Sequence, residues 1–451
     1  MLKHFKLPNW LIKYTVTLVL IIIPLYPKFP FIKISGTFVS IRLEDFILLF
    51  AGLIVFINLV PWWKTAVKNN IYKSVVLYLV IGFVSLVSAY FVTRTIEIQI
   101  GLLHWIRRIE YFIPLFLGYY AIKSRKDSDY YFKLILVVIV LSFIYGFGQK
   151  YFEWPIIITQ NEEYSKGVAL RWLPGSHINS TFAGHYDLAT FLVLVLPIIT
   201  AALFMIKGKM SKIIILFVGL SGLWLLVNTA SRISLASFVV ASGLTLIFIK
   251  KYKFIPLLFV LVLVFSGLSS NLRMRYIRIY DVIKKQTEMD NKVDSSYISA
   301  AYAQNDFLLK RIGTSPTPSV APRFEDRSTN IRLNVEWPRA IRALKKNPLL
   351  GTGYSSITLA TDNDYLRLLG ETGLLGFFGF LLVIARIGVK IKAIFPLSRY
   401  SVTEQSILSG YYGGFAGILI NALFIDVFEA SKFAIIFWLL SGLTLCLISK
   451  K

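Results

Sequence analysis

Residues 347–385 read NPLLGTGYSSITLATDNDYLRLLGETGLLGFFGFLLVIA, and this stretch passes from a turn through a polar cluster into an apolar run. Pro348 and the glycines that follow it predict the turn. The polar cluster at 361–364 then opens an apolar segment at 366–385, which has the length of about 20 residues that a transmembrane helix needs. The pattern predicts a membrane helix whose polar entrance lies at one face of the bilayer.

The rest of the chain repeats this alternation of apolar blocks and charged connections. Of its 451 residues, 56% are hydrophobic, whereas soluble domains have roughly 45–50%. We therefore expect an all-α fold, namely a polytopic membrane bundle of about twelve transmembrane helices with one large, partly helical extracytoplasmic loop. The predicted spans are 11–25, which we expect to remain uncleaved, and 43–60, 74–91, 106–122, 132–148, 185–206, 213–228, 233–249, 254–270, 366–385, 407–425 and 432–449.

The charges predict an orientation for these helices. The chain has 49 lysines and arginines against 24 acidic residues, a formal net charge of +25. Many of the basic residues lie in alternate connections, which by the positive-inside rule face the cytoplasm. Both termini are therefore predicted to be cytoplasmic.

Three regions follow from this topology. Residues 1–270 hold transmembrane helices 1–9 with an external loop at about 149–184, residues 271–365 form the large extracytoplasmic loop, and residues 366–451 hold helices 10–12. Within the large loop, Arg327 to Lys346 is expected to be helical. The loop contains more basic than acidic residues, which favours an anionic ligand on the outer face.

Several classes of site are absent from the sequence. The four histidines, at 4, 104, 177 and 185, include no His-Glu-x-x-His pair, so no metal site of that kind is predicted. Gly351-Thr-Gly353 lacks the Gly-Lys-Ser/Thr ending of a phosphate-binding P-loop. Cys446 stands alone, and no aromatic-basic module of the nucleic-acid kind occurs. We expect no metal, no cofactor and no nucleic-acid partner.

A polar stripe marks the start of the segment at 366–385. Asn363, Arg367 and Glu371 follow one another at intervals of four residues, so on a helix they share one face. Polar groups at that depth usually face a cavity. The alternative is structural: Asp362 or Thr361 caps the helix, and Arg367 pairs with Glu371.

The motifs of this region resemble those of a known family. Pro-Leu-x-Gly-x-Gly at 348–353, then Asp362-Asn-x-Tyr-Leu366, then Glu371-x-Gly-Leu-Leu-Gly376 is similar to the signature of the O-antigen ligase and polymerase superfamily. Further pieces agree in order along the chain: Arg42-Leu-Glu-Asp45, Ser180-Thr-Phe-Ala-Gly184, Thr229-Ala-Ser-Arg232, and Arg332 to Trp337.

The resemblance implies a metal-independent, inverting glycosyltransferase of the bacterial inner (plasma) membrane with an extracytoplasmic active site. Such enzymes transfer glycan from an undecaprenyl-pyrophosphate-linked oligosaccharide to an acceptor hydroxyl on a glycan or lipid. Membrane lipids and a chain-length regulator are the other partners that the resemblance suggests.

Residue roles also follow from the resemblance. Arg232 and Arg332 match arginines that hold the pyrophosphate, and Arg171 is a candidate third contact. A guanidinium suits this role because it stays charged and grips phosphate oxygens with two hydrogen bonds. Asp362 stands where ligases have histidine and is the predicted base, with Asn363 and Glu371 positioning the acceptor. Without the resemblance, the structural alternatives are an interfacial arginine for Arg232 and ordinary loop charges for Arg332 and Arg171.

The departure from histidine at Asp362 favours an O-antigen or exopolysaccharide polymerase over an O-antigen ligase. A protein O-oligosaccharyltransferase of the same family is a further alternative. A secondary transporter or lipid-linked sugar flippase is the alternative from another class. Transporters commonly show two related halves with broken helices at midplane, and the sequence has no such repeat.

Overall fold

The computed structural model describes residues 8–33, 40–59, 69–156, 176–269, 277, 284, 331–357 and 360–450. Nearly all of the regular structure in these residues is helical. The main helices are α1 (Asn9–Leu25), α2 (Leu43–Leu59), α4 (Asn70–Ser88), α5 (Ile98–Ala121), α6 (Arg125–Tyr151), α7 (His185–Met205), α8 (Lys209–Asn228), α9 (Arg232–Phe248), α10 (Ile255–Leu268), α13 (Trp337–Lys346), α14 (Asp364–Gly388), α15 (Val402–Asn421) and α16 (Ser431–Ser449).

Each predicted span overlaps one of these helices, so the helical membrane fold is confirmed for the described residues. Six described helices are long and apolar enough to cross a membrane, and they start at Asn70, Arg125, His185, Lys209, Asp364 and Ser431. The count of about twelve crossings stays a prediction. So do the three regions, because most of the residues in 271–330 lie outside the described part of the chain.

One element departs from the all-α prediction. The strand β1 (Pro30–Lys33) pairs antiparallel with β2 (Ser40–Arg42) and joins the end of α1 to the start of α2. The ribbon was missed because strands of three or four residues have no periodic signal of their own. Pairing satisfies backbone groups of the segment that connects the two helices.

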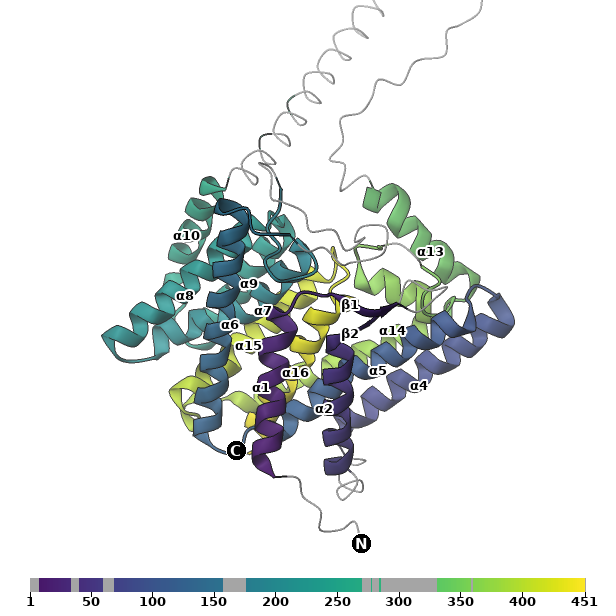
Figure 1. Cartoon of the computed structure of the whole chain (residues 1–451), viewed down its shortest axis with the longest axis horizontal. Coiled ribbons are helices and arrows are strands. Elements are labelled where there is room, and N and C mark those ends of the chain that lie inside the picture. Colours follow the sequence, from purple (N-terminus) through teal and green to yellow (C-terminus); the bar gives the residue numbers. More distant parts are fainter. Residues whose placement is uncertain are drawn as a thin grey trace, which may run out of the picture.

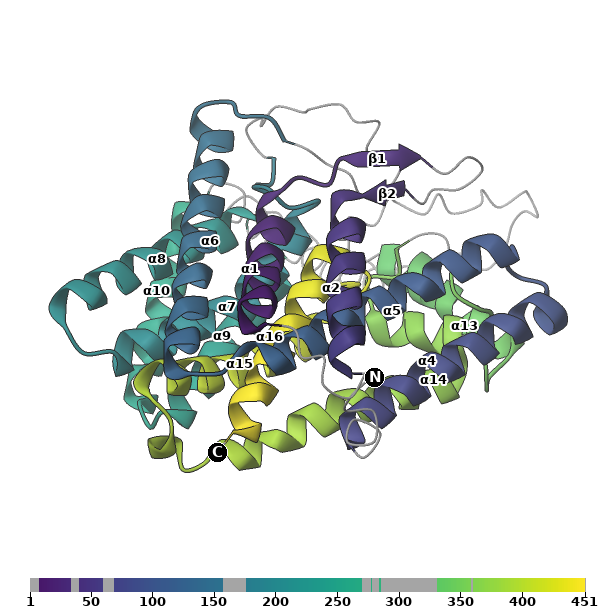
Figure 2. The same ribbon diagram turned by 60° about the horizontal axis from the view of Figure 1, so that its bottom comes forward.

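The centre of the bundle is formed by α7, α15 and α16 (Figures 1 and 2), and most of their side chains are buried. Small residues let α15 approach α7 closely. A Cβ added at Gly414 would lie 2.6 Å from the carbonyl oxygen of Leu194 on α7. Close backbone approach through small residues is how helices associate where lipid removes the hydrophobic driving force.

The first and last helices run in opposite directions. The Nζ atom of Lys432, at the start of α16, donates hydrogen bonds to the carbonyl oxygens of Tyr26 (2.7 Å) and Pro24 (3.3 Å) at the end of α1. The start of α1 and the end of α16 therefore lie together at the opposite end of the bundle (Figure 1). This agrees with an even number of crossings. Which end faces the cytoplasm stays a prediction from the charges.

Helix α14 is interrupted at Gly373, which has φ 66° and ψ −169°. The loop at 347–353, the glycine-rich part of the signature, lies against the break and bonds the groups that the break releases. The N–H groups of Thr352 and Gly353 donate to the carbonyl oxygens of Gly370 (3.0 Å) and Glu371 (2.8 Å), while those of Leu374 and Leu375 donate to Pro348 (2.9 Å) and Leu349 (3.1 Å). The break is thus stabilised by the backbone of the loop.

The signature loop also carries α13 to its position beside α14. Gly370 of α14 lies against α13, and a Cβ added there would lie 3.0 Å from the carbonyl oxygen of Ala340 and 3.3 Å from the Cβ of Ala343. The helix expected within Arg327 to Lys346 is confirmed for residues 331–346, and it begins with a π-helical turn at Arg332–Glu336. Arg332 and the start of α14 are brought together by this packing.

Substitution of Gly373 by alanine should destabilise the fold. The backbone conformation at Gly373 is nearly exclusive to glycine and costs other residues about 1–3 kcal/mol. An added Cβ would also collide with the backbone of Leu349. We expect Gly373→Ala to lower the midpoint of thermal unfolding in detergent micelles.

Gly267→Ala is the matched control, because no atom lies within 4 Å of a Cβ added there. Equal unfolding midpoints for the two variants would contradict this account of the break.

Candidate functional site

The structure brings two of the predicted site residues, Arg332 and Asp362, into direct contact. The Nε and Nη2 atoms of Arg332 donate hydrogen bonds to Oδ2 of Asp362 at 3.0 and 2.7 Å. Arg332 is only 9% exposed and opens the π-helical turn before α13. Such turns are frequent at functional sites. The pair joins segments thirty residues apart, and only the packing of α13 on α14 makes the contact.

Asp362 lies outside the predicted span at 366–385, and the structure places it just before α14. Helix α14 begins at Asp364, and Asp362 has a left-handed backbone with φ 49°. That conformation is uncommon for residues other than glycine and costs roughly 1–2 kcal/mol. Contacts with neighbouring residues must therefore stabilise the left-handed backbone of Asp362.

Asp426 holds the backbone on both sides of Asp362. Its Oδ2 accepts a hydrogen bond from the N–H of Thr361 at 2.8 Å, and its Oδ1 accepts one from the N–H of Asn363 at 3.0 Å. Asp426 lies in the connection between α15 and α16, outside every motif identified in the sequence. No sequence signal would have singled it out, because its role depends on a contact across more than sixty residues of chain.

Asn363 caps α14. Its side-chain oxygen accepts a hydrogen bond from the N–H of Leu366 at 3.0 Å. The structural alternative is therefore right that a residue of the polar cluster caps the helix, but wrong about which one, because the cap is Asn363 rather than Asp362 or Thr361. A direct contact between Asn363 and an acceptor stays a prediction.

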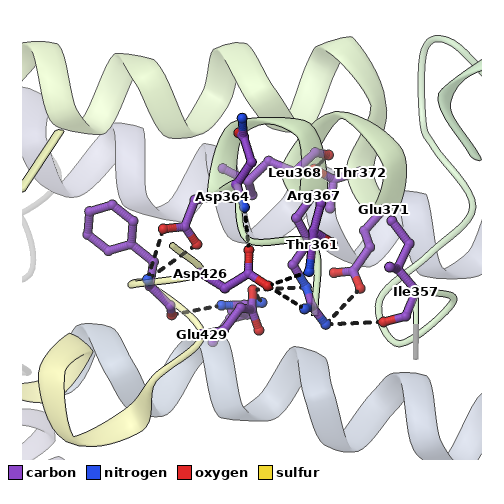
Figure 3. A network of polar contacts seen from close by, with 12 residues as sticks. Ile357, Thr361, Asp364, Arg367, Leu368, Glu371, Thr372, Asp426 and Glu429 are labelled. Atoms are coloured by element: carbon purple, nitrogen blue, oxygen red, sulfur yellow. Dashed lines mark hydrogen bonds and ion pairs between the residues drawn. The ribbon is translucent and has the colours of Figure 1, made fainter. Parts of the chain in front are cut away.

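Glu371 belongs to a buried charge network centred on Arg367 (Figure 3). Arg367 lies 3.5 Å from Glu371, 3.2 Å from Asp426 and 3.7 Å from Glu429, measured between nitrogen and carboxylate oxygen. Glu429 also pairs with Arg108 of α5. Glu371 therefore pairs with Arg367, as the structural alternative predicted. Arg367 in turn pairs with Asp426, which bonds the backbone on either side of Asp362.

The arginines of the network keep Glu429 in its charged form. Burial alone would raise the pKa of Glu429, but Arg108 and Arg367 outweigh it and lower the pKa to about 2. Glu429 is therefore ionised at physiological pH. Buried charges of this kind are stable only as a set, because removal of one member leaves another unpaired.

The carboxyl group of Asp362 is in a different electrostatic setting. Burial raises its pKa above the ordinary value, the guanidinium of Arg332 opposes that shift, and the nearby carboxylate of Asp426 adds to it. The charged form of Asp362 is thus stabilised by one arginine and disfavoured by burial and by Asp426. Perturbed groups of this kind are common in active sites.

Arg232 begins α9 at the same end of the bundle. Two residues further on, Ser234 Oγ donates to Oδ1 of Asn421 (3.1 Å), whose Nδ2 donates to Oγ1 of Thr190 on α7 (3.1 Å). One turn before Thr190 lies Tyr186, whose hydroxyl interacts with Arg332. These contacts connect the start of α9 to the Arg332 side of the site.

Arg171, the third predicted pyrophosphate contact, lies outside the described residues. The described residues include no cluster of three histidine, cysteine, aspartate or glutamate side chains that could hold a metal ion. The site that the structure does describe is built from arginines, carboxylates and backbone groups.

A family model described as O-Antigen ligase matches residues 215–381. The match agrees with the resemblance found in the sequence and, together with the apolar helices, indicates a multi-pass membrane protein. It includes Arg232, Arg332 and Asp362, whereas Asp426 and Glu429 lie beyond it. No curated protein matches the chain.

Asp426→Asn should destabilise the start of α14. An amide supplies one acceptor oxygen where the carboxylate uses two, so a backbone N–H beside Asp362 loses its partner at a cost of about 1–3 kcal/mol. The charge opposite Arg367 is lost as well. We expect a lower midpoint of thermal unfolding.

Asp129→Asn removes an exposed carboxylate on α6 and is the control. If Asp426→Asn unfolds at the same temperature as this control, Asp426 does not hold the backbone around Asp362.

Proposed function

We propose, from the family match and the Arg332–Asp362 pair, that this protein transfers oligosaccharide from an undecaprenyl-pyrophosphate donor to an acceptor hydroxyl. A polymerase of O-antigen or exopolysaccharide is the favoured form, because Asp362 takes the position that ligases give to histidine. An O-antigen ligase and a protein O-oligosaccharyltransferase perform the same chemistry on other acceptors and remain the alternatives.

The observation that carries the proposal is the pair of hydrogen bonds from Arg332 to a single carboxylate oxygen of Asp362. Two N–H groups of one guanidinium converge on one anionic oxygen, and a pyrophosphate oxygen presents the same charge and geometry. The low exposure of Arg332 strengthens its interaction with a bound anion. Asp362 keeps the guanidinium oriented until the donor arrives.

The chemistry requires little beyond these groups. The bond between the anomeric carbon and the pyrophosphate oxygen breaks, and its electron pair stays on that oxygen. Arg332, together with Arg232, stabilises the developing negative charge. The acceptor hydroxyl attacks from the opposite face, which inverts the anomeric centre, and its proton passes to a carboxylate of the site. We propose no metal ion for this step because the arginines supply the positive charge.

The location of the pair suits a lipid-linked donor. Asp362 precedes α14 at the end where α16 begins, since Asp364 accepts a hydrogen bond from the N–H of Val427 at 2.7 Å. This end is opposite to the start of α1 and the end of α16. If the termini are cytoplasmic, as the charges predict, the site faces the outer side of the inner membrane.

One observation favours a transporter or flippase. Helix α14 is broken at Gly373, and transporters use broken helices to bind substrate at midplane. In this chain, however, the loop at 347–353 bonds the groups released by the break, so they are engaged within the protein. Transport of a lipid-linked sugar into vesicles without formation of polymer would favour this second candidate.

Replacement of the site residues should impair transfer. We expect Arg332→Ala to lower the rate at least about 100-fold, the usual cost of losing a donor to a developing anion. Arg332→Lys should also be impaired, because an ammonium keeps the charge but not the paired N–H groups. Arg232→Ala and Asp362→Ala should shorten the product. The readout is the length distribution of glycan in cells.

Arg342→Ala, an exposed arginine on α13, serves as the control and should leave glycan length unchanged. Undiminished polymer in the alanine variants at 232, 332 and 362 would refute the assignment. The product separates the alternatives: free polymer on the carrier, glycan on the lipid A core, or glycoprotein.

A further inference from the structure

Three polar side chains that follow Arg332 along the helix have buried atoms that no described residue bonds. They are Oε2 of Glu336, Nε1 of Trp337 and Nη1 of Arg339, and no described residue bonds them. Glu336 follows Arg332 by four residues on the same π-helical turn, and Trp337 begins α13. Buried polar atoms nearly always have partners, so three such atoms within four residues call for an explanation. A bound ligand that supplies the missing hydrogen-bond partners would explain them.

The chemistry of the three groups selects the kind of ligand. Together they offer one hydrogen-bond acceptor, two donors and the apolar face of an indole ring. A sugar ring presents hydroxyls that both donate and accept, as well as apolar C–H groups. A free phosphate is disfavoured because it would meet the carboxylate of Glu336, and an isoprenoid tail would leave all three polar atoms unpaired.

We propose that Glu336, Trp337 and Arg339 bind the acceptor sugar, and that Glu336, rather than Asp362, takes the proton from its attacking hydroxyl. This inference rests on the glycosyl transfer proposed above. It assigns Asp362 a positioning role, in which it orients the guanidinium of Arg332 towards the pyrophosphate.

The hydrogen bonds support this division of roles. Oδ2 of Asp362 receives both bonds from Arg332, so this oxygen is already engaged by the arginine. Oε2 of Glu336 is buried and accepts no hydrogen bond from any described residue. An oxygen that must receive a proton needs a lone pair that no other donor occupies.

The charges around Glu336 also suit a base. Asp362 and Asp426 face it from the segments beside α14 and between α15 and α16, and Arg332 and Arg339 face it from its own segment. Burial and the two carboxylates raise the pKa of Glu336 to about 7, against the opposing effect of the two arginines. A base whose pKa lies near the working pH is the most effective.

In the proposed step Glu336 accepts the proton and Arg332 holds the leaving group. The O–H bond of the acceptor breaks and its proton moves to the carboxylate of Glu336. The acceptor oxygen forms a bond to the anomeric carbon, and the bond from that carbon to the pyrophosphate breaks. The electron pair stays on the pyrophosphate oxygen, held by Arg332. Glu336 later releases the proton to water.

Glu336→Gln in the full-length protein, reconstituted in liposomes with an undecaprenyl-pyrophosphate oligosaccharide, tests the proposal. Because Glu336 must be ionised to act, the wild-type rate should rise with pH through about 7 and then level off. The variant should be slower by about 100-fold or more, lose this pH dependence, and bind the donor as tightly as the wild type. Asp362→Asn should instead weaken donor binding and keep the pH dependence.

Glu97→Gln changes an exposed carboxylate before α5 and is the control. A wild-type rate with the same rise through pH 7 in Glu336→Gln would overturn the proposal while the proposed function stands. Absence of transfer by the wild-type protein would instead contradict the proposed function itself.

Trp337→Phe gives an independent test that does not depend on the stability of Glu336→Gln. It removes the indole N–H, which bonds no described residue, and keeps an aromatic ring to pack beside Phe424, so the fold should be retained. We expect the KM for the acceptor to rise about tenfold, the effect of one lost hydrogen bond, with the KM for the donor unchanged. Trp10→Phe, at an exposed position on α1, is the control. An unchanged acceptor KM would rule out the acceptor subsite.

Discussion

A helix that breaks inside a membrane must find new partners for the backbone groups that it releases, because lipid offers none. In this protein the loop at 347–353 meets that requirement for α14 at Gly373. The same loop leads directly out of α13, so the hydrogen bonds that stabilise the break also hold α13 along the first half of α14. The contact between Arg332 and Asp362 is a consequence of this docking. The glycine-rich signature is therefore structural in its immediate role, and it supports the site by fixing two helices.

The start of α14 is held from a second direction by the connection between α15 and α16. Asp426 bonds the backbone on either side of Asp362, and Asp364 bonds the backbone of Val427 in return. Arg367 and Glu429 extend these contacts into a charge network that reaches α5 through Arg108. The left-handed conformation of Asp362 is maintained because its neighbours are bonded on both sides. The site thus depends on segments that lie far apart in the chain.

The electrostatics divide the site into two halves. Arg332 has a carboxylate partner in Asp362, and this pairing preserves a buried guanidinium for an anionic ligand. Glu336 ends the π-helical turn that Arg332 begins, Trp337 and Arg339 follow it, and all three have buried polar atoms that no described residue bonds. A transferase with a pyrophosphate donor and a hydroxyl acceptor needs both an anion site and a proton acceptor next to it. The arrangement of charged groups around one turn of helix supports such a reaction.

The sequence alone determined the helical membrane architecture, because long apolar runs must leave water and a helix bonds its own backbone within each run. It also identified Arg332 and Asp362 through motifs that stand close to one another. It could not show that Asn363 caps α14 or that Asp426 bonds the backbone beside Asp362. Nor could it show that Glu336 has a buried oxygen that no described residue bonds. The short ribbon of β1 and β2 had no periodic signal. Hydrophobic patterning is a local property of the chain, whereas the partner of a buried charge depends on which distant segments pack together, and only the tertiary structure decides that.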